Sequence, residues 1–202
     1  MKKAIRLFSL LVLITITFIG CKSSDESHAQ KFAQEFGENL YTVNAQKVTE
    51  YNKMLKESKK VAVANEVMIE NGGVVPHTPA YIKTMQSLDK NIQPLMVKKA
   101  YEATAGNRFN ILSTEICAKG NYTCQVTDII LDKNLYTDKK DKAGYYYEAK
   151  LKFISTNGKT DRMDTAKGYI GLSKENGQWK VFVYESKESP TLYNEMMKNI
   201  KP

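Results

Sequence analysis

Three cysteines are the side chains of this sequence best placed for covalent chemistry. Cys117 and Cys124 lie close together in the chain, and such a pair can form a disulfide, stay reduced or bind a metal ion. Two thiols without a nearby histidine make a poor metal site, so we expect no metal there. Cys21 stands apart, at the point where a run of apolar residues gives way to lysine, serines and acids. The two positions therefore indicate different chemistry.

Residues 1–20 have the three parts of an export signal. Lys2, Lys3 and Arg6 form a basic start, the apolar run LFSLLVLITITFI follows, and the small residue Gly20 precedes the junction. The apolar run is about a dozen residues long, whereas a membrane-spanning helix needs roughly 20. We therefore expect this segment to be a signal peptide for export and not a membrane anchor.

The stretch TFIGC resembles the lipobox of bacterial lipoproteins, in which cleavage leaves the cysteine as the new N-terminus with a thioether-linked diacylglycerol. Phe18 replaces the usual leucine, while Gly20 and Cys21 match. The resemblance implies that Cys21 is lipidated; an ordinary secretory leader with an incidental cysteine is the alternative. Two acyl chains give the double anchor that stable membrane attachment requires. Residues 21–28 would then be the lipidated cysteine and a flexible tether.

Export of the protein would affect the oxidation state of Cys117 and Cys124. Disulfides persist outside the cytoplasm, which favours a bridge between Cys117 and Cys124. Gly120 and Asn121 lie between them and suit a tight reversal of the chain. The sequence therefore predicts a hairpin-like segment CAKGNYTC closed by a structural disulfide, and two free thiols remain the main alternative.

Charge and length limit the possible partners. The chain has 202 residues and a formal net charge of +8, to which the leader contributes three cations. About 180 residues follow the leader, which suits one compact domain over residues 29–202. The lysines are scattered in short clusters such as KESKK and DKKDK, without a continuous basic stripe. We therefore expect no nucleic-acid partner, and a lysine-rich surface near anionic lipid head groups instead.

The first half of the domain has helical periodicity. Apolar residues recur at three-to-four spacing over residues 29–40, and a second apolar face covers residues 48–55. Thr78 followed by Pro79 is typical of a helix start, because proline lacks the N–H that would be unpaired there. Pro94 interrupts this third helix, and the segment LMVKKAYEAT restarts it.

From Tyr122 onward the pattern is that of strands. YTCQVTDIIL is strand-like, and GYYYEAKLKFIS alternates between buried and solvent-facing residues. Asn-Gly pairs at 157–158 and 176–177 predict tight hairpins, because both central residues of the favoured turn need positive φ. The strands that these turns connect are 144–155, 160–173 and 178–186. We therefore expect an α+β fold, with N-terminal helices packed on a curled antiparallel sheet of four or more strands.

This order of elements resembles the nuclear transport factor 2-like superfamily, also called cystatin-like. The segments LMVKKAYEATAGNRF, YTCQVTDIIL, YYYEAKLKF and GYIGLSKENGQWKV resemble small lipoproteins of Gram-positive bacteria with that fold, over about residues 29–186. The resemblance implies a cone-shaped domain with a space between sheet and helices. The superfamily includes ketosteroid isomerases and scytalone dehydratases, and also domains of cell-envelope and conjugation machinery.

Enzymes of this superfamily use an aspartate base, a His–Asp dyad or tyrosine donors inside the cone. The two histidines, His28 and His77, lie in the tether and in a proline-flanked loop, so we expect no buried dyad. Asp128 is the best candidate base, provided that its strand buries the face it shares with Val126. If the strand buries its other face, Asp128 lies in water, and Asp132 on the same side favours this second arrangement.

Four further side chains are weaker candidates. Tyr145 and Tyr147 are possible donors into a pocket, although alternating tyrosines more often form a core with a hydrogen-bonded rim. Arg108 suits a carboxylate or a ligand anion, or it caps the carbonyls of a helix end. Trp179 alternates with valines, which favours a core position over a binding role. No phosphate-binding glycine loop, Gly-x-Ser-x-Gly or His-Glu-x-x-His motif is present, which excludes the commoner hydrolases that carry them.

We interpret the chain as a lipid-anchored domain on the outer face of the cytoplasmic membrane, or facing a periplasm. It is expected to bind a small apolar ligand or an envelope protein, without catalysis and without a cofactor. One alternative is an isomerase or lyase that uses Asp128 with tyrosine donors, and another is an accessory subunit of a conjugation or secretion assembly. An outward Asp128 would leave the enzyme alternative without a base.

Overall fold

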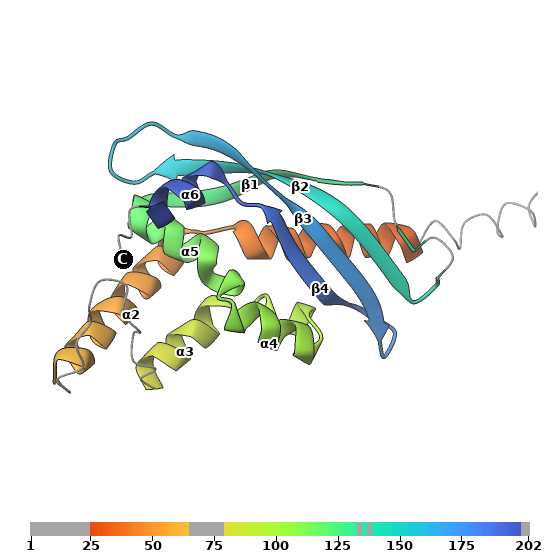
Figure 1. Cartoon of the computed structure of the whole chain (residues 1–202), viewed down its shortest axis with the longest axis horizontal. Coiled ribbons are helices and arrows are strands. Elements are labelled where there is room, and N and C mark those ends of the chain that lie inside the picture. Colours follow the sequence, from red (N-terminus) through yellow and green to blue (C-terminus); the bar gives the residue numbers. More distant parts are fainter. Residues whose placement is uncertain (1–24, 65–78, 133–134, 137–138, 199–202) are drawn as a thin grey trace, which may run out of the picture.

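The structure, a computed structural model of the chain, describes residues 25–64, 79–132, 135–136 and 139–198. Helices make up the first half and strands the second, with a short helix at the end (Figure 1). The predicted α+β fold is confirmed, with helices packed on a curled antiparallel sheet. Cys21 and the leader lie outside the described residues. Within the described part, no helix is both long and apolar enough to cross a membrane.

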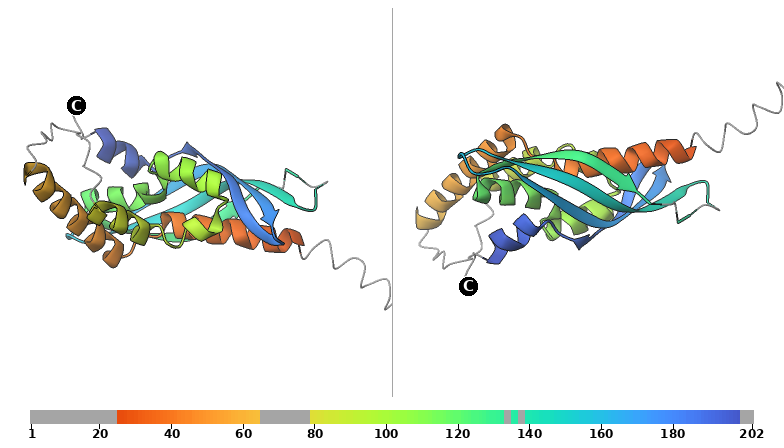
Figure 2. Two further views of the ribbon diagram at one scale, coloured as in Figure 1. Left: turned by 90° about the horizontal axis from the view of Figure 1, so that it is seen from below. Right: turned by 90° about the horizontal axis from the view of Figure 1, so that it is seen from above.

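The first described helix spans residues 25–41 and packs against the inner face of the sheet (Figure 2). Its buried positions include those that the spacing predicted, namely Ala29, Ala33, Phe36 and Leu40. Residues 25–28, which we expected to belong to the tether, form the first turn of this helix. The helix therefore begins four residues after Cys21.

The remaining elements of the helical half are α2 (Ala45–Ala64), α3 (Pro79–Leu88), a 3₁₀ turn (Gln93–Leu95), α4 (Lys98–Gly106) and α5 (Phe109–Gly120). The helix start at Pro79 agrees with the sequence prediction, while Thr78 lies outside the described residues. Pro94 does not interrupt this helix, because α3 already ends at Leu88 and Pro94 lies in the 3₁₀ turn. The hairpin-like interpretation of CAKGNYTC is wrong in its first half, because these residues form the last turn of α5. The reversal occurs at Asn121, whose left-handed backbone (φ 59°) ends the helix.

The sheet consists of β1 (Tyr122–Leu131), β2 (Lys142–Ser155), β3 (Arg162–Glu175) and β4 (Gln178–Glu188), paired in that order, and α6 (Thr191–Lys198) follows it. The predicted tight turn between β3 and β4 is confirmed, since Asn176 and Gly177 both have positive φ. The β2–β3 connection is longer than the predicted two-residue turn. Only Gly158 has positive φ there, and the carboxylate of Asp161 accepts a hydrogen bond from the Ser155 amide at 3.1 Å.

The inner face of β2 forms the centre of the core. Its inward residues are Tyr145, Tyr147, Ala149, Leu151 and Phe153, and all are buried, as the alternation predicted. The helices lie on this side, and the view from above shows the outer face of the sheet with no described helix lying across it (Figure 2). The fold therefore offers two places for function, the interior between helices and sheet and the open outer face.

Both edge strands of the sheet pair with a segment outside it. On β1, Val43 exchanges two backbone hydrogen bonds with Cys124, of 2.9 and 2.8 Å. On β4, the amide of Val97 donates to the carbonyl of Val181 at 2.9 Å. These contacts connect each edge strand to the helical half of the molecule.

Candidate functional site

A bulge in β1 decides where Asp128 lies. The pairing register with β2 shifts between Val126 and Asp128, so that Thr127 is the extra residue. The bulge exchanges the faces of the strand, and Ile129, after it, is buried at 5% exposure. The side chain of Asp128 is 52% exposed, and its carboxylate lies 3.8 Å from the ammonium of Lys150. The candidate base is therefore on the outer surface and not in the interior.

Three tyrosine hydroxyls meet in the interior and form a closed triangle. They belong to Tyr41 on the first helix, Tyr147 on β2 and Tyr184 on β4, and their oxygens are 2.8, 3.0 and 3.2 Å apart in pairs. Each hydroxyl has one hydrogen to donate to one neighbour and lone pairs to accept from the other, so the triangle satisfies itself. Tyr145, the other candidate donor, is fully buried, and its hydroxyl has no hydrogen-bond partner among the described residues.

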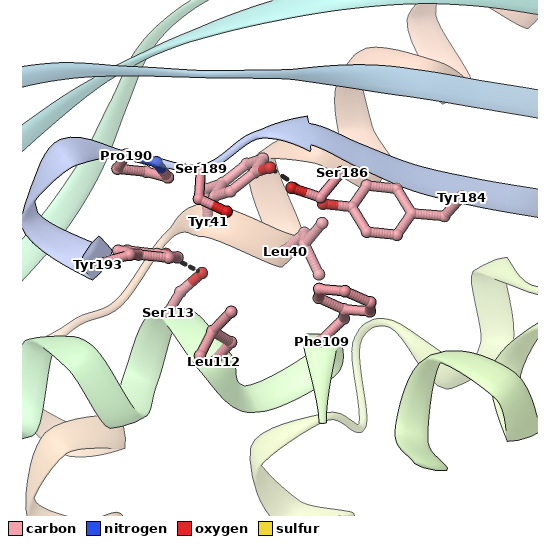
Figure 3. A pocket seen from close by; sticks show the side chains of 10 residues that line it. All are labelled: Leu40, Tyr41, Phe109, Leu112, Ser113, Tyr184, Ser186, Ser189, Pro190 and Tyr193. Carbon is pink, nitrogen blue, oxygen red and sulfur yellow. Dashed lines mark hydrogen bonds between the residues drawn. The ribbon is translucent and has the colours of Figure 1, made fainter. Parts of the chain in front are cut away.

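A small pocket adjoins the triangle where the first helix, α5, β4 and α6 converge (Figure 3). Its walls include Leu40, Phe109 and Leu112, and the hydroxyl of Tyr193 donates to Ser113 at 2.6 Å beside it. The pocket leaves about 10 Å³ for the centre of a water molecule, which is room for about one water. Side chains therefore fill this part of the interior, and an apolar ligand does not fit without their displacement.

Burial controls the protonation of the tyrosine triangle. Loss of contact with water raises the pKa of Tyr41, Tyr147 and Tyr184 above the ordinary value of a phenol. Neighbouring phenols add to this for Tyr41 and Tyr147, because a second negative charge is unfavourable beside the first. All three groups are therefore neutral hydrogen-bond donors and acceptors at neutral pH.

The triangle is expected to make stability fall at alkaline pH. Unfolded tyrosines lose their protons near pH 10, whereas the buried phenols keep theirs, so the unfolded state then binds fewer protons. The free energy of unfolding should therefore decrease as pH rises above about 10. Tyr147→Phe should cost about 1 kcal/mol at neutral pH through the lost hydrogen bonds, and should make the alkaline decrease less steep. Urea denaturation at pH 8 and pH 10.5 measures both effects.

Tyr146→Phe is the matched control, because this neighbouring tyrosine is 42% exposed on the opposite face of β2. It should change neither the stability at neutral pH nor the slope of the alkaline decrease. An unchanged slope in Tyr147→Phe would show that the triangle is not the source of the pH dependence.

Cys117 at the end of α5 and Cys124 on β1 are both buried and lie side by side. The structure holds them as free thiols that form a hydrogen bond with each other, so the predicted bridge is not present in it. This hydrogen bond and burial raise the pKa of the Cys117 thiol. Because the thiolate is the reactive form, the pair is poorly suited to redox catalysis.

Arg108 and Trp179 both have partners within the protein. Arg108 precedes α5 with a left-handed backbone (φ 60°), and its guanidinium lies 2.9 Å from the carboxylate of Glu115. Its partner is thus a carboxylate and not the helix carbonyls. Trp179 is only partly buried at the rim of the core, and the ammonium of Lys174 lies 4.9 Å from the centre of its ring. Neither residue lines the tyrosine pocket.

A buried carboxylate in the helical half was missed by sequence reasoning. Asp89, just after α3, is 2% exposed and accepts hydrogen bonds from the hydroxyl of Tyr101 and, at 2.7 Å, from the amide of Asn110. One oxygen of Asp89 and the amide oxygen of Asn110 have no hydrogen-bond partner in the described part of the chain. These contacts connect α3, α4 and α5, so the role of Asp89 is structural.

The outer face of the sheet presents aromatic rings around a pair of glycines. Gly144 on β2 and Gly171 on β3 lie opposite each other in the register. A Cβ atom on Gly144 would lie 2.4 Å from the hydroxyl of Tyr169, and one on Gly171 would lie 3.0 Å from the ring of Phe182. Real Cβ atoms essentially never lie closer than 3.0 Å to another atom. Gly144 therefore makes room for Tyr169, and Gly171 makes room for the side chain of Val183, at 2.5 Å, and for the neighbouring Phe182 ring. Glycine inside a strand was the available sequence signal.

Lysines lie over two rings of this face, the exposed ring of Tyr146 and the half-buried ring of Phe182. Tyr146 is 5.5 Å from the neighbouring Tyr169, measured between ring centres. The ammonium of Lys187 lies 4.3 Å from the centre of the Tyr146 ring, and that of Lys142 lies 5.7 Å from the Phe182 ring. We call these five residues the outer aromatic patch. It combines apolar area with positive charge on a face of the sheet that no described helix covers, and the ring of Tyr136 lies over Gly144 beside it.

The chain matches no protein-family model, and it matches no curated protein sequence. Among solved structures it is similar to an IcmL-like type IV secretion system protein from Legionella pneumophila subsp. pneumophila. The sequence identity is 14%, the TM-score is 0.36, and the likeness covers 55% of this chain and 78% of that chain. A TM-score this low transfers neither fold nor function to the present chain.

Proposed function

We propose that the protein is a membrane-anchored lipoprotein of the cell envelope, with a domain of nuclear transport factor 2-like type that binds a protein partner without catalysis. The outer aromatic patch is the observation that carries this proposal. Tyr146 is exposed, and the rings of Tyr169 and Phe182 are half-buried beside it. Aromatic rings of this kind are enriched at protein interfaces, where they supply large contact area. The lipid on Cys21 would hold this surface at the membrane.

The filled pocket beside the tyrosine triangle and the outward position of Asp128 support binding at the surface over the two other functions. A small apolar ligand has no room beside the tyrosine triangle. The isomerase or lyase alternative needs a base inside the cone, and Asp128 instead pairs with Lys150 on the outer surface. The accessory-subunit alternative is a special case of partner binding, and it would use the same patch.

A photoreactive phenylalanine analogue in place of Tyr146 tests the proposal in intact cells. Irradiation should join the analogue at this position to one defined envelope protein. The matched control places the same analogue at Lys53 on α2, whose side chain is 74% exposed and distant from the patch in sequence and fold. The proposal fails if position 146 gives no adduct, or if both positions give the same adducts. The identity of the partner decides whether it belongs to a secretion assembly.

The same proposal places the cysteine pair in an oxidising compartment. Cys117 and Cys124 are already in contact, so the bridge that we predicted from the sequence requires little movement of α5 and β1. It would join the last helix before the sheet to the first strand. Alkylation of the exported protein before and after reduction distinguishes a bridged pair from two free thiols.

A further inference from the structure

One end of the domain lies within a short reach of the proposed lipid anchor. The first helix begins at Asp25, which is four positions after Cys21 in the chain. An extended chain advances at most about 3.6 Å per residue, so Asp25 lies no more than about 14 Å from the lipidated residue. Whatever the path of this segment, the start of the helix must stay close to the lipid head groups.

A hydrogen-bonded ion pair shows which part of the sheet lies beside the start of the first helix. A carboxylate oxygen of Asp25 lies 2.8 Å from the ammonium of Lys174, near the end of β3. The same ammonium lies 4.9 Å from the ring centre of Trp179, at the start of β4. Asp25, Lys174 and Trp179 therefore connect the first helix to the β3–β4 turn. Figure 1 shows the start of the helix and this turn at one end of the molecule.

We propose that the end of the domain that carries the β3–β4 turn rests on the phospholipid surface, with Trp179 at the level of the head groups. This inference rests on the lipid anchor of the proposed function. Tryptophan is enriched at membrane–water interfaces because its ring is apolar and its N–H remains able to bind water. Lys174 and Lys180 flank it, but their ammonium groups are bound within the protein, to the carboxylate of Asp25 and to the carbonyl of Pro94. The contact with lipid therefore depends on the tryptophan ring.

Net charge contributes little to this contact. In the sheet, the segment before β2 and the first turn of the first helix, the described lysines at this end are Lys139, Lys140, Lys142, Lys174 and Lys180, and the acids are Asp25, Glu26, Asp141 and Glu175. Positive and negative groups nearly balance, so the short tether and the interfacial tryptophan hold the orientation. The contact should therefore form on zwitterionic lipid as well as on anionic lipid.

The chain has one tryptophan, so Trp179 is a built-in probe of this contact. The lipidated full-length protein is bound to vesicles of phosphatidylcholine, with or without phosphatidylglycerol, in which part of the lipid carries a nitroxide on its head group. We expect most of the Trp179 fluorescence to be quenched in both compositions. A Gly-Ser insert of about twelve residues after Ser24, which adds about 20 Å of reach, should remove most of the quenching.

A second control moves the probe to the opposite end of the sheet. In Trp179→Phe with Lys159→Trp, the fluorophore lies in the β2–β3 connection, at the far end of the strands from the β3–β4 turn (Figure 1). Its fluorescence should be unchanged by the nitroxide. Two outcomes in vesicle-bound protein would overturn the inference and leave the lipid anchor in place. One is that Trp179 is not quenched, and the other is that the tryptophan at position 159 is quenched as strongly as Trp179. Protein that carries no lipid and does not bind vesicles overturns the anchor and the inference together.

Discussion

The Cys21→Ser protein is expected to lose its lipid completely and to appear as unprocessed precursor or as a shed soluble domain. Only a thiol at this position can form the thioether to diacylglycerol. Metabolic labelling with a radioactive fatty acid, followed by fractionation of membrane and medium, measures the effect. The matched control is Cys117→Ser, which removes a buried thiol of the domain and should keep the label.

Label that persists in the Cys21→Ser protein would contradict lipidation at this residue. Label that is absent from the unaltered protein would contradict the lipobox interpretation as a whole. Protein released into the medium, with the label lost, would show in addition that the domain folds without its anchor.

The second large effect is expected for Phe36→Ala, with a loss of about 3–5 kcal/mol in the free energy of unfolding. Phe36 is fully buried on the inner side of the first helix, and its ring packs edge-on against Tyr184 at 5.7 Å between centres. The change leaves a cavity between helix and sheet that the surrounding strands cannot fill. A loss of this size is a large part of the stability of a typical domain.

Phe32→Ala is the control, because Phe32 lies one turn earlier on the same helix and is only partly buried against the core. It removes the same atoms with the same change in helix propensity, and its cost should be clearly smaller. Equal costs in urea denaturation would indicate that the first helix packs less tightly on the sheet than the structure shows.

The parts of the fold that sequence reasoning predicted correctly are those with a strict repeat. The period of two in β2 placed Tyr145, Tyr147 and their neighbours in the core, and the Asn-Gly pair at 176–177 located a hairpin. α5 was missed because its buried positions do not form a narrow stripe. Its buried residues include Asn110, Ser113, Thr114 and Glu115 as well as apolar side chains, and polar residues on a buried helix face obscure the period.

The position of Asp128 could not be settled from the sequence for a different reason. A bulge adds one residue to a strand and exchanges its two faces, and nothing in the residues around Thr127 marks it. The tyrosine triangle was equally hidden, because Tyr41, Tyr147 and Tyr184 come from three distant segments. Their meeting depends on how the first helix crosses the sheet, which is a property of packing and not of local pattern.

The backbone contacts at Val43 and Val97 have a consequence for copies crowded on one membrane. If Cys21 carries the proposed lipid, the molecules diffuse in a plane, where the edges of neighbouring sheets can meet. An open edge would let strands of one copy extend the sheet of the next, which is the route to fibrous aggregates. Here Val43 occupies part of the β1 edge and Val97 part of the β4 edge. High surface density should therefore leave the copies separate.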